Sequence, residues 1–152
     1  MSSDVSLRMM ELSMQGFGCS QIMILLALEA QGRSNPELVR AISGLQGGLG
    51  FCGKNCGSLT AACCLLALYA GRGTAEEVED SRLQEMIRTL VEWFENDCVS
   101  KYGGIDCAAI LQGDPRNQIA RCPGIIMETM RKVQEILAEN GIDFNQDPHS
   151  AE

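Results

Sequence analysis

Apolar residues recur three or four positions apart along most of this chain, which is the spacing of residues on one face of an α-helix. Residues 4–14 give a clear example, with Val5, Met9 and Leu12 at helical spacing. Nowhere does a run of strand length alternate strictly between apolar and polar residues. The pattern therefore predicts an all-α fold, a single-domain bundle of six or seven helices with a glycine-rich, cysteine-bearing loop.

Glycine, proline and capping residues mark where the predicted helices begin and end. Asn35 before Pro36 is a typical N-cap followed by proline in the first turn. Thr74 and Glu77 have the spacing of a capping box, so we expect a long amphipathic helix to follow and to end near Tyr102. The helices are expected at residues 4–14, 19–31, 36–43, 58–70, about 78–102 and 107–112, with a last one that opens at Cys122-Pro123 and stops at Gly141.

The chain has 152 residues, enough for a single domain to bury a sizeable core without disulfides. We expect one helical domain over residues 1–141 and a flexible tail over residues 142–152. Because the start of the chain lacks a signal-peptide pattern and no apolar run reaches the roughly 18 residues of a membrane span, we expect a cytoplasmic protein without a membrane partner. The net charge of −8 argues against a nucleic-acid partner, since binding phosphates needs Lys and Arg.

The eight cysteines are unusual for a reducing compartment, where thiols more often bind metals, catalyse reactions or fill cores than form disulfides. Four of them lie in the first turn of a predicted helix or just before it. Free backbone N–H groups and the helix dipole lower the pKa of a thiol there and favour the thiolate, the form that binds metals. Convergence of the four would make a metal or cluster site. They are Cys19, Cys56, Cys107 and Cys122.

The glycine-rich loop before the fourth predicted helix carries Cys52 and Cys56 as a C-x3-C pair. Backbone N–H groups of such a loop can hydrogen-bond to cluster sulfurs or to an anion, although glycines also serve plain helix packing. The other three cysteines, Cys63, Cys64 and Cys98, fall on apolar helices, where we expect cysteine to be a small core residue.

Four parts of the sequence form a pattern: GFGCSQ at residues 16–21, GGLGFCGKNCGSLTAA at 47–62, GGIDCAAILQG at 103–113 and the later Cys122. Together they resemble a known family, the redox-active C-GCAxxG-C-C family. The resemblance covers roughly residues 10–137, and the family's cysteines correspond in order to Cys19, Cys56, Cys107 and Cys122. No literal GCAxxG occurs in the glycine loop, so Cys52 is either a substitute for the family's second cysteine or an additional residue.

The resemblance implies a small helical redox protein, similar to the iron–sulfur-bearing portion of the split-Soret cytochromes without their haem-binding segment. We therefore expect an electron-transfer or metal-binding protein rather than an enzyme with its own substrate. An iron–sulfur cluster would be held by the four family cysteines, with Cys52 as a substitute or additional ligand, and the partner would be another redox protein. Zinc on the same thiolates is the alternative cofactor and would make the domain a metal-stabilised interaction module.

A metal-free thiol–disulfide or sulfur-handling enzyme is the other alternative. Cys56 would be its attacking thiol and Cys52 its resolving partner. The only histidine, His149, lies in the tail and offers no general base, although a helix N-terminus can activate a thiol unaided. The apolar helix faces could also support a homodimer.

Overall fold

The computed structural model describes residues 3–149 and confirms the all-α fold. Within that range it contains seven α-helices, one short 3-10 helix and no β-strand, only an isolated bridge. The elements are α1 (Ser3–Met14), α2 (Cys19–Ala30), α3 (Pro36–Ile42), the 3-10 helix η1 (Ser43–Leu45), α4 (Gly57–Ala70), α5 (Leu83–Tyr102), α6 (Cys107–Leu111) and α7 (Arg116–Glu139).

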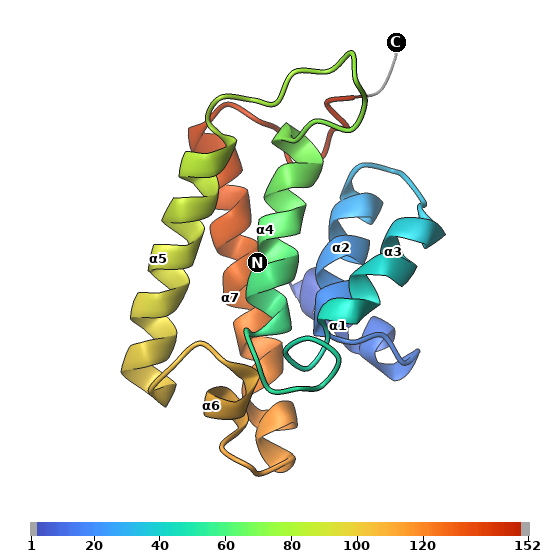
Figure 1. Cartoon of the computed structure of the whole chain (residues 1–152). Helices are drawn as coiled ribbons and strands as arrows, with labels where there is room; N and C mark the ends of the chain where they lie inside the picture. The colour runs from blue at the N-terminus through green and yellow to red at the C-terminus, as the bar shows by residue number, and fades with distance from the viewer. Residues whose placement is uncertain (1–2, 150–152) are drawn as a thin grey trace.

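Helix α4 is the centre of the bundle and packs against α2, α5 and α7 (Figure 1). Its sequence, GSLTAACCLLALYA, carries no charged residue, as is typical of a helix buried on most sides. Leu65 and Leu66 are fully buried, and Phe94 of α5 and Val133 of α7 are no more than 1% exposed. These side chains belong to one continuous core.

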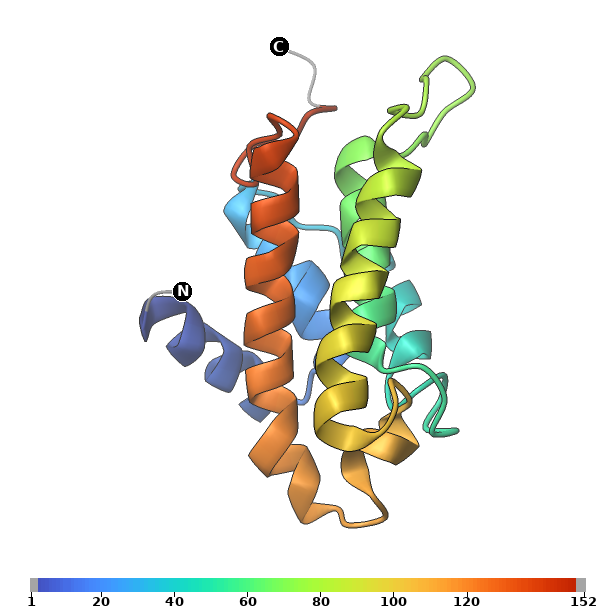
Figure 2. The same ribbon diagram turned by 90° about the vertical axis from the view of Figure 1, so that its left-hand side faces the viewer.

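Helix α1 projects from the bundle and packs mainly on α2 (Figure 2). Met9 and Leu12 face inward and are buried. Leu7, Met10 and Met14 on the same helix are exposed. Much of the apolar surface of α1 therefore has no covering within the described chain.

The glycine loop, α6 and the first turns of α7 lie together at the lower end of the bundle (Figure 1). An antiparallel bridge between Asn55 and Asp106 joins the glycine loop to the segment before α6. On either side of it, the Cys56 N–H donates to the Ile105 carbonyl at 3.1 Å, and the Cys107 N–H donates to the Lys54 carbonyl at 2.7 Å. Two segments distant in sequence are thus fixed side by side.

The start of the long amphipathic helix was predicted wrongly, because α5 begins at Leu83 rather than near Val78. Glu77 does accept the N–H groups of Gly73 and Thr74, but within a turn that does not continue as a helix. Val78, which the predicted helix would include as one of its apolar residues, is 89% exposed. The capping-box pattern therefore formed the hydrogen bond from the Thr74 N–H to the Glu77 carboxylate without starting a helix.

The start of the last helix was also predicted wrongly. Helix α7 begins at Arg116, whose N–H is accepted by the Asp114 carboxylate at 3.0 Å, and it contains Pro123 in its interior. An interior proline removes one helical hydrogen bond, so other contacts must hold this part of the helix. Asn117 and Arg121 supply them by donating to the carbonyls of Leu111 and Ile110 in α6.

The segment after α7 makes defined contacts with the bundle. The Tyr69 hydroxyl donates to the Phe144 carbonyl at 2.6 Å, and the two rings stack with centroids 5.8 Å apart. Arg33 pairs with Asp147 at 3.1 Å. The domain boundary at residue 141 and the flexibility of residues 142–152 stay predictions, and residues 150–152 lie outside the described part. In residues 3–149, no helix is both long and apolar enough to cross a membrane.

Candidate functional site

A cavity of about 700 Å³ opens at the lower end of the bundle, and four cysteines line it. Its walls come from α1, the start of α2, the glycine loop, the start of α4, α6 and the first half of α7. The four are Cys19, Cys56, Cys107 and Cys122, the residues that the sequence singled out as ligands. The structure thus brings these thiols to one space from four separate segments.

Cys19 is the first residue of α2, and hydrogen bonds from both sides fix this helix start. The Gln21 side chain accepts the Gly18 N–H at 3.3 Å, donates to the Val39 carbonyl at 3.2 Å and accepts the Gln46 amide at 2.7 Å. The start of α2 is therefore tied both to α3 and to the glycine loop.

The beginning of α4 approaches the Cys19 sulfur very closely. A Cβ atom at Gly57 would lie 2.8 Å from the Cys19 Sγ and 2.8 Å from the Leu45 carbonyl oxygen. Both distances are too short for any side chain, so only glycine allows this packing. Cys56, directly before Gly57, consequently lies near Cys19.

Cys107 opens α6, and the backbone bridge described above holds its segment against the one that carries Cys56. Cys122 differs from the other three because it lies inside α7 rather than in a first turn. The expectation that all four cysteines occupy helix starts is therefore wrong for Cys122. It still lines the cavity, immediately before Pro123, which lines it too.

Burial raises the pKa of all four thiols, to about 11 for Cys56 and about 12 for Cys122. For Cys19 and Cys56, hydrogen bonds from backbone N–H groups and from the Ser58 side chain oppose this rise. The backbone N–H groups at the helix starts do lower the thiol pKa values, but burial raises them by more. Charge on Cys56, Cys19 and Cys107 further raises the pKa of Cys122, so the four sulfurs lie within electrostatic reach of one another.

The other cysteines do not line this cavity. Cys52 is exposed on the glycine loop, with its Sγ 3.9 Å from the Gly50 carbonyl oxygen. Cys98 is 1% exposed, which confirms it as a core residue, whereas Cys64 is exposed and Cys63 half-buried. The prediction that Cys64 is a core residue is wrong. Successive side chains on a helix point about 100° apart, so Cys64 faces away from the half-buried Cys63 toward solvent.

The cavity is larger than the coordination shell of one ion. Within residues 3–149, no group of three or more His, Cys, Asp or Glu side chains is arranged to hold a single metal ion. All eight cysteines are free thiols. The donor set bordering the cavity is therefore made of soft sulfur groups spaced around a common volume, with no carboxylate or imidazole among its lining residues.

A family model described as "Putative redox-active protein (C_GCAxxG_C_C)" matches residues 17–136. The chain belongs to this family. The matched region runs from before Cys19 to beyond Cys122 and therefore contains every cavity cysteine. Neither the curated proteins nor the solved structures gave a match to the chain.

As a C_GCAxxG_C_C protein, this chain carries the second cysteine in the context NCGSLTA rather than in a literal GCAxxG. Cys56, and not Cys52, lines the cavity with the other three cysteines. The family description gives redox activity as the coarse function. Which thiols bind a cofactor stays a prediction.

Sequence reasoning missed three polar residues that build the site. Gln21 and Gln46 hold the start of α2 against the glycine loop, and Ser58 lowers the pKa of both Cys19 and Cys56. The spacing of Gly18 and Gln21 is that of a capping box with glycine at the N-cap, which could have indicated Gln21. No sequence signal distinguishes Ser58 from an ordinary first-turn serine.

Proposed function

We propose that this protein is an electron-transfer protein in which Cys19, Cys56, Cys107 and Cys122 hold an iron–sulfur cluster. The observation that carries the proposal is the single cavity lined by these four thiols. Thiolate is the soft ligand that iron–sulfur clusters and zinc use. When bound, the cluster would supply a one-electron redox centre.

The spacing of the thiols favours a cluster over zinc. Four thiolates on one zinc ion lie about 2.3 Å from it and must crowd together. Within the described residues no such set of three or more ligands is arranged around one point. A cluster distributes its thiolates over two or more iron atoms and so tolerates a wider separation, in keeping with the four thiols around a shared cavity.

The residues around the thiols suit a buried redox centre. Backbone N–H groups of Gly47 and Ser20 lower the pKa of the Cys19 thiol, and those of Ser58 and Leu59 lower the pKa of the Cys56 thiol, so polar donors lie near both sulfurs. A protein sets the reduction potential of a cluster through hydrogen bonds to the ligand sulfurs and through exclusion of water. Because burial raises the thiol pKa values, loading with metal must release protons and is favoured by higher pH.

The metal-free dithiol alternative receives less support. Cys56 is buried and its pKa is raised to about 11, which disfavours an attacking thiolate near neutral pH. Cys52, its proposed resolving partner, is exposed and does not line the cavity. A cytoplasmic location and a redox protein as electron donor or acceptor complete the proposal; eight free thiols suit a reducing compartment.

The test is iron and acid-labile sulfide analysis of the full chain purified without oxygen, together with its visible spectrum. We expect iron, sulfide and a visible band, all lost in Cys19→Ser, Cys56→Ser, Cys107→Ser and Cys122→Ser. Cys64→Ser, exposed on α4 outside the cavity, is the matched control and should retain the iron. We expect Cys52→Ser to retain it as well. A colourless protein with one zinc per chain would overturn the proposal.

A further inference from the structure

The thiols line only one part of the cavity. Most of the remaining wall is apolar and comes chiefly from α1 and α7, with Met9, Met10 and Met14 from the first helix and Ile125, Ile126 and Met127 from the second. Pockets of about 300–1,000 Å³ are the size of small-molecule sites, and this one has about 700 Å³. A cluster of a few iron and sulfur atoms would leave much of that volume open.

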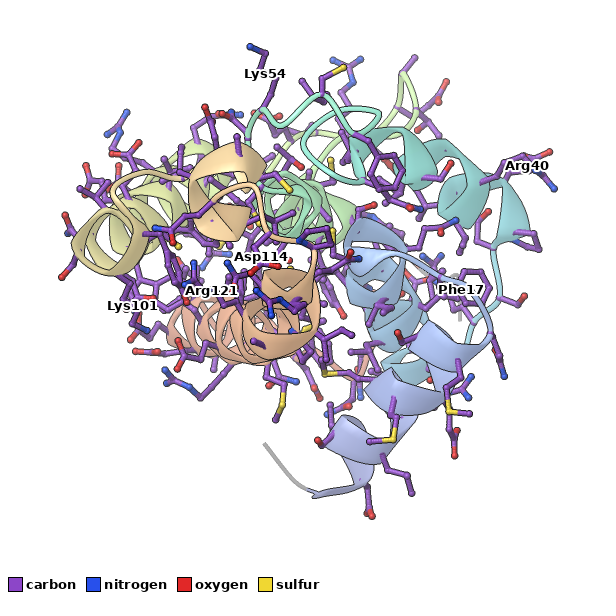
Figure 3. All side chains as sticks on the ribbon, turned by 90° about the horizontal axis from the view of Figure 1, so that it is seen from below. Phe17, Arg40, Lys54, Lys101, Asp114 and Arg121 are labelled. Atoms are coloured by element: carbon purple, nitrogen blue, oxygen red, sulfur yellow. The ribbon has the colours of Figure 1, made fainter. Side chains whose placement is uncertain are left out.

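Among the described residues, none of those that line the cavity is charged, although Asp, Glu, Lys and Arg make up 21% of the chain. Its polar side chains are hydroxyls, amides and the thiols, Ser58 and Gln118 among them. Viewed from the cavity end, Arg40 and Lys54 point outward from the ribbon (Figure 3), and Lys101 pairs with Asp97 of α5 and Glu128 of α7. A charged ligand would therefore lose its hydration without gaining an ion pair, which is costly.

The mouth of the cavity is also apolar. Met10, Met14, Phe51 and Ile119 line the cavity and are nevertheless 60%, 83%, 75% and 83% exposed. They come from α1, the glycine loop and the beginning of α7. Large apolar side chains in contact with water around an opening are typical of a ligand-binding site.

We propose that the apolar part of this cavity binds a neutral, ring-containing small molecule next to the thiols. The absence of charged lining residues selects a neutral ligand, and the volume admits one or two fused rings. Methionine favours a ring because its sulfur makes favourable contacts with aromatic edges and its unbranched chain adapts to the ligand's shape. That such a molecule would lie beside a redox centre rests on the proposed function, whereas binding itself does not.

Two dyes with the same aromatic skeleton test the charge selection. N-phenyl-1-naphthylamine is neutral, and 8-anilino-1-naphthalenesulfonate carries one negative charge; both gain fluorescence in apolar sites. We expect the full chain to bind the neutral dye at least about tenfold more tightly, a difference of about 1.4 kcal/mol. Equal binding, or tighter binding of the sulfonate, would overturn the proposal.

Two substitutions on α1 provide a matched pair. Met10 and Leu7 are similarly exposed, at 60% and 56%, but only Met10 lines the cavity. Met10→Trp should narrow the mouth and weaken binding of the neutral dye about tenfold, whereas Leu7→Trp should change it less than about twofold. An equal loss in both variants, accompanied by a change in sedimentation, would mean that a second copy covers α1 and would overturn the proposal.

Iron is measured in the same samples, so the two proposals can fail separately. Iron without binding of the neutral dye overturns the ligand site alone. Binding of the dye to a protein that never acquires iron or sulfide overturns the cluster alone. Far-ultraviolet circular dichroism of both tryptophan variants shows that any loss of binding is not a loss of helix.

Discussion

Two regions of the bundle differ in how they are packed. The core between α4, α5 and α7 is filled with buried side chains, whereas the cavity end keeps an open volume. In the core, Leu66, Leu90 and Phe94 are no more than 1% exposed. At the cavity end, Phe51 and Ile119 are mostly exposed although they line a hollow. Packing without voids gives stability, and an open volume gives a place for chemistry.

The backbone differs between the two regions as well. In the described part of the chain, the non-glycine residues with positive φ are Leu49 at 65°, Phe51 at 62° and Gln112 at 53°. The first two lie in the glycine loop and the third ends α6, so all three belong to the cavity end. Strained backbone of this kind is tolerated where function requires a special geometry. The core supplies the stability that offsets it.

The largest expected effect is a loss of core packing. Phe94→Ala should lower the free energy of unfolding by about 3–5 kcal/mol, because a fully buried ring is removed and a cavity remains. Val99→Ala, on the same helix but 53% exposed, should change it by less than about 0.5 kcal/mol. Urea unfolding followed by circular dichroism measures both. Similar losses would contradict the assignment of the core.

A smaller effect is expected where the cavity end is tightly packed. Gly57→Ala adds a Cβ 2.8 Å from the Cys19 Sγ and should cost about 1–3 kcal/mol, with lower iron content in the same protein. Gly44→Ala is the control, because a Cβ there would meet nothing within 4 Å. If Gly57→Ala were as stable as the control, the close approach of α4 to Cys19 would be incorrect.

The thiols make the metal-free protein less stable at alkaline pH. Burial raises the pKa of Cys56 to about 11, so the folded state keeps a proton that the unfolded chain loses above about pH 9. This contribution is fully present below pH 9 and is lost as the pH rises toward 11. We expect about 1 kcal/mol less stability from Cys56 at pH 10 than at pH 8.

Urea midpoints of reduced, metal-free protein at pH 8 and pH 10 check this expectation. Cys56→Ala should show a smaller difference between the two pH values than the unsubstituted chain. Cys64→Ala, on the exposed side of α4, serves as the comparison substitution. If the difference in urea midpoint between pH 8 and pH 10 is as large in Cys56→Ala as in the unsubstituted chain, Cys56 is not the cause of the lower stability at alkaline pH.

The smallest effect is expected at the end opposite the cavity. Hydrogen bonds from Arg82 lower the pKa of Asp80 to about 2, so its stabilisation is present above about pH 4 and is lost as the pH falls toward 2. Since the Asp80–Arg82 pair is exposed and screened by solvent, Asp80→Asn should lower the free energy of unfolding by less than about 1 kcal/mol at neutral pH. Thermal unfolding at pH 7 and pH 3 measures it, and an undiminished cost at pH 3 would contradict the assignment.

Local patterns predicted the helices well where they agreed with the packing. The Asn35 side chain accepts the Leu38 N–H at 3.1 Å, as its capping signal indicated. At Thr74 and at Cys122-Pro123 the local signals were equally clear, but the structure starts helices elsewhere. Contacts between α6 and α7 carry the last helix through Pro123, and no single segment contains that information.

The candidate site was predictable in its parts rather than in its arrangement. Cys19, Cys56 and Cys107 lie at or next to helix starts as expected, and all three line the cavity with Cys122. The sequence could not show that burial would outweigh the helix starts in setting the thiol pKa values. It also could not show the apolar part of the cavity, because that part forms only where α1 and α7 line the same space.

The backbone bridge between Asn55 and Asp106 affects the order in which parts of the fold form. It joins segments separated by two long helices, α4 and α5, so its formation closes a long loop of chain. Pairing of residues so distant in sequence is slow compared with helix formation. We therefore expect a newly made chain to pass through a stage in which its helices are formed but Cys56 and Cys107 are still apart, so that assembly of the thiol set is a late event in maturation.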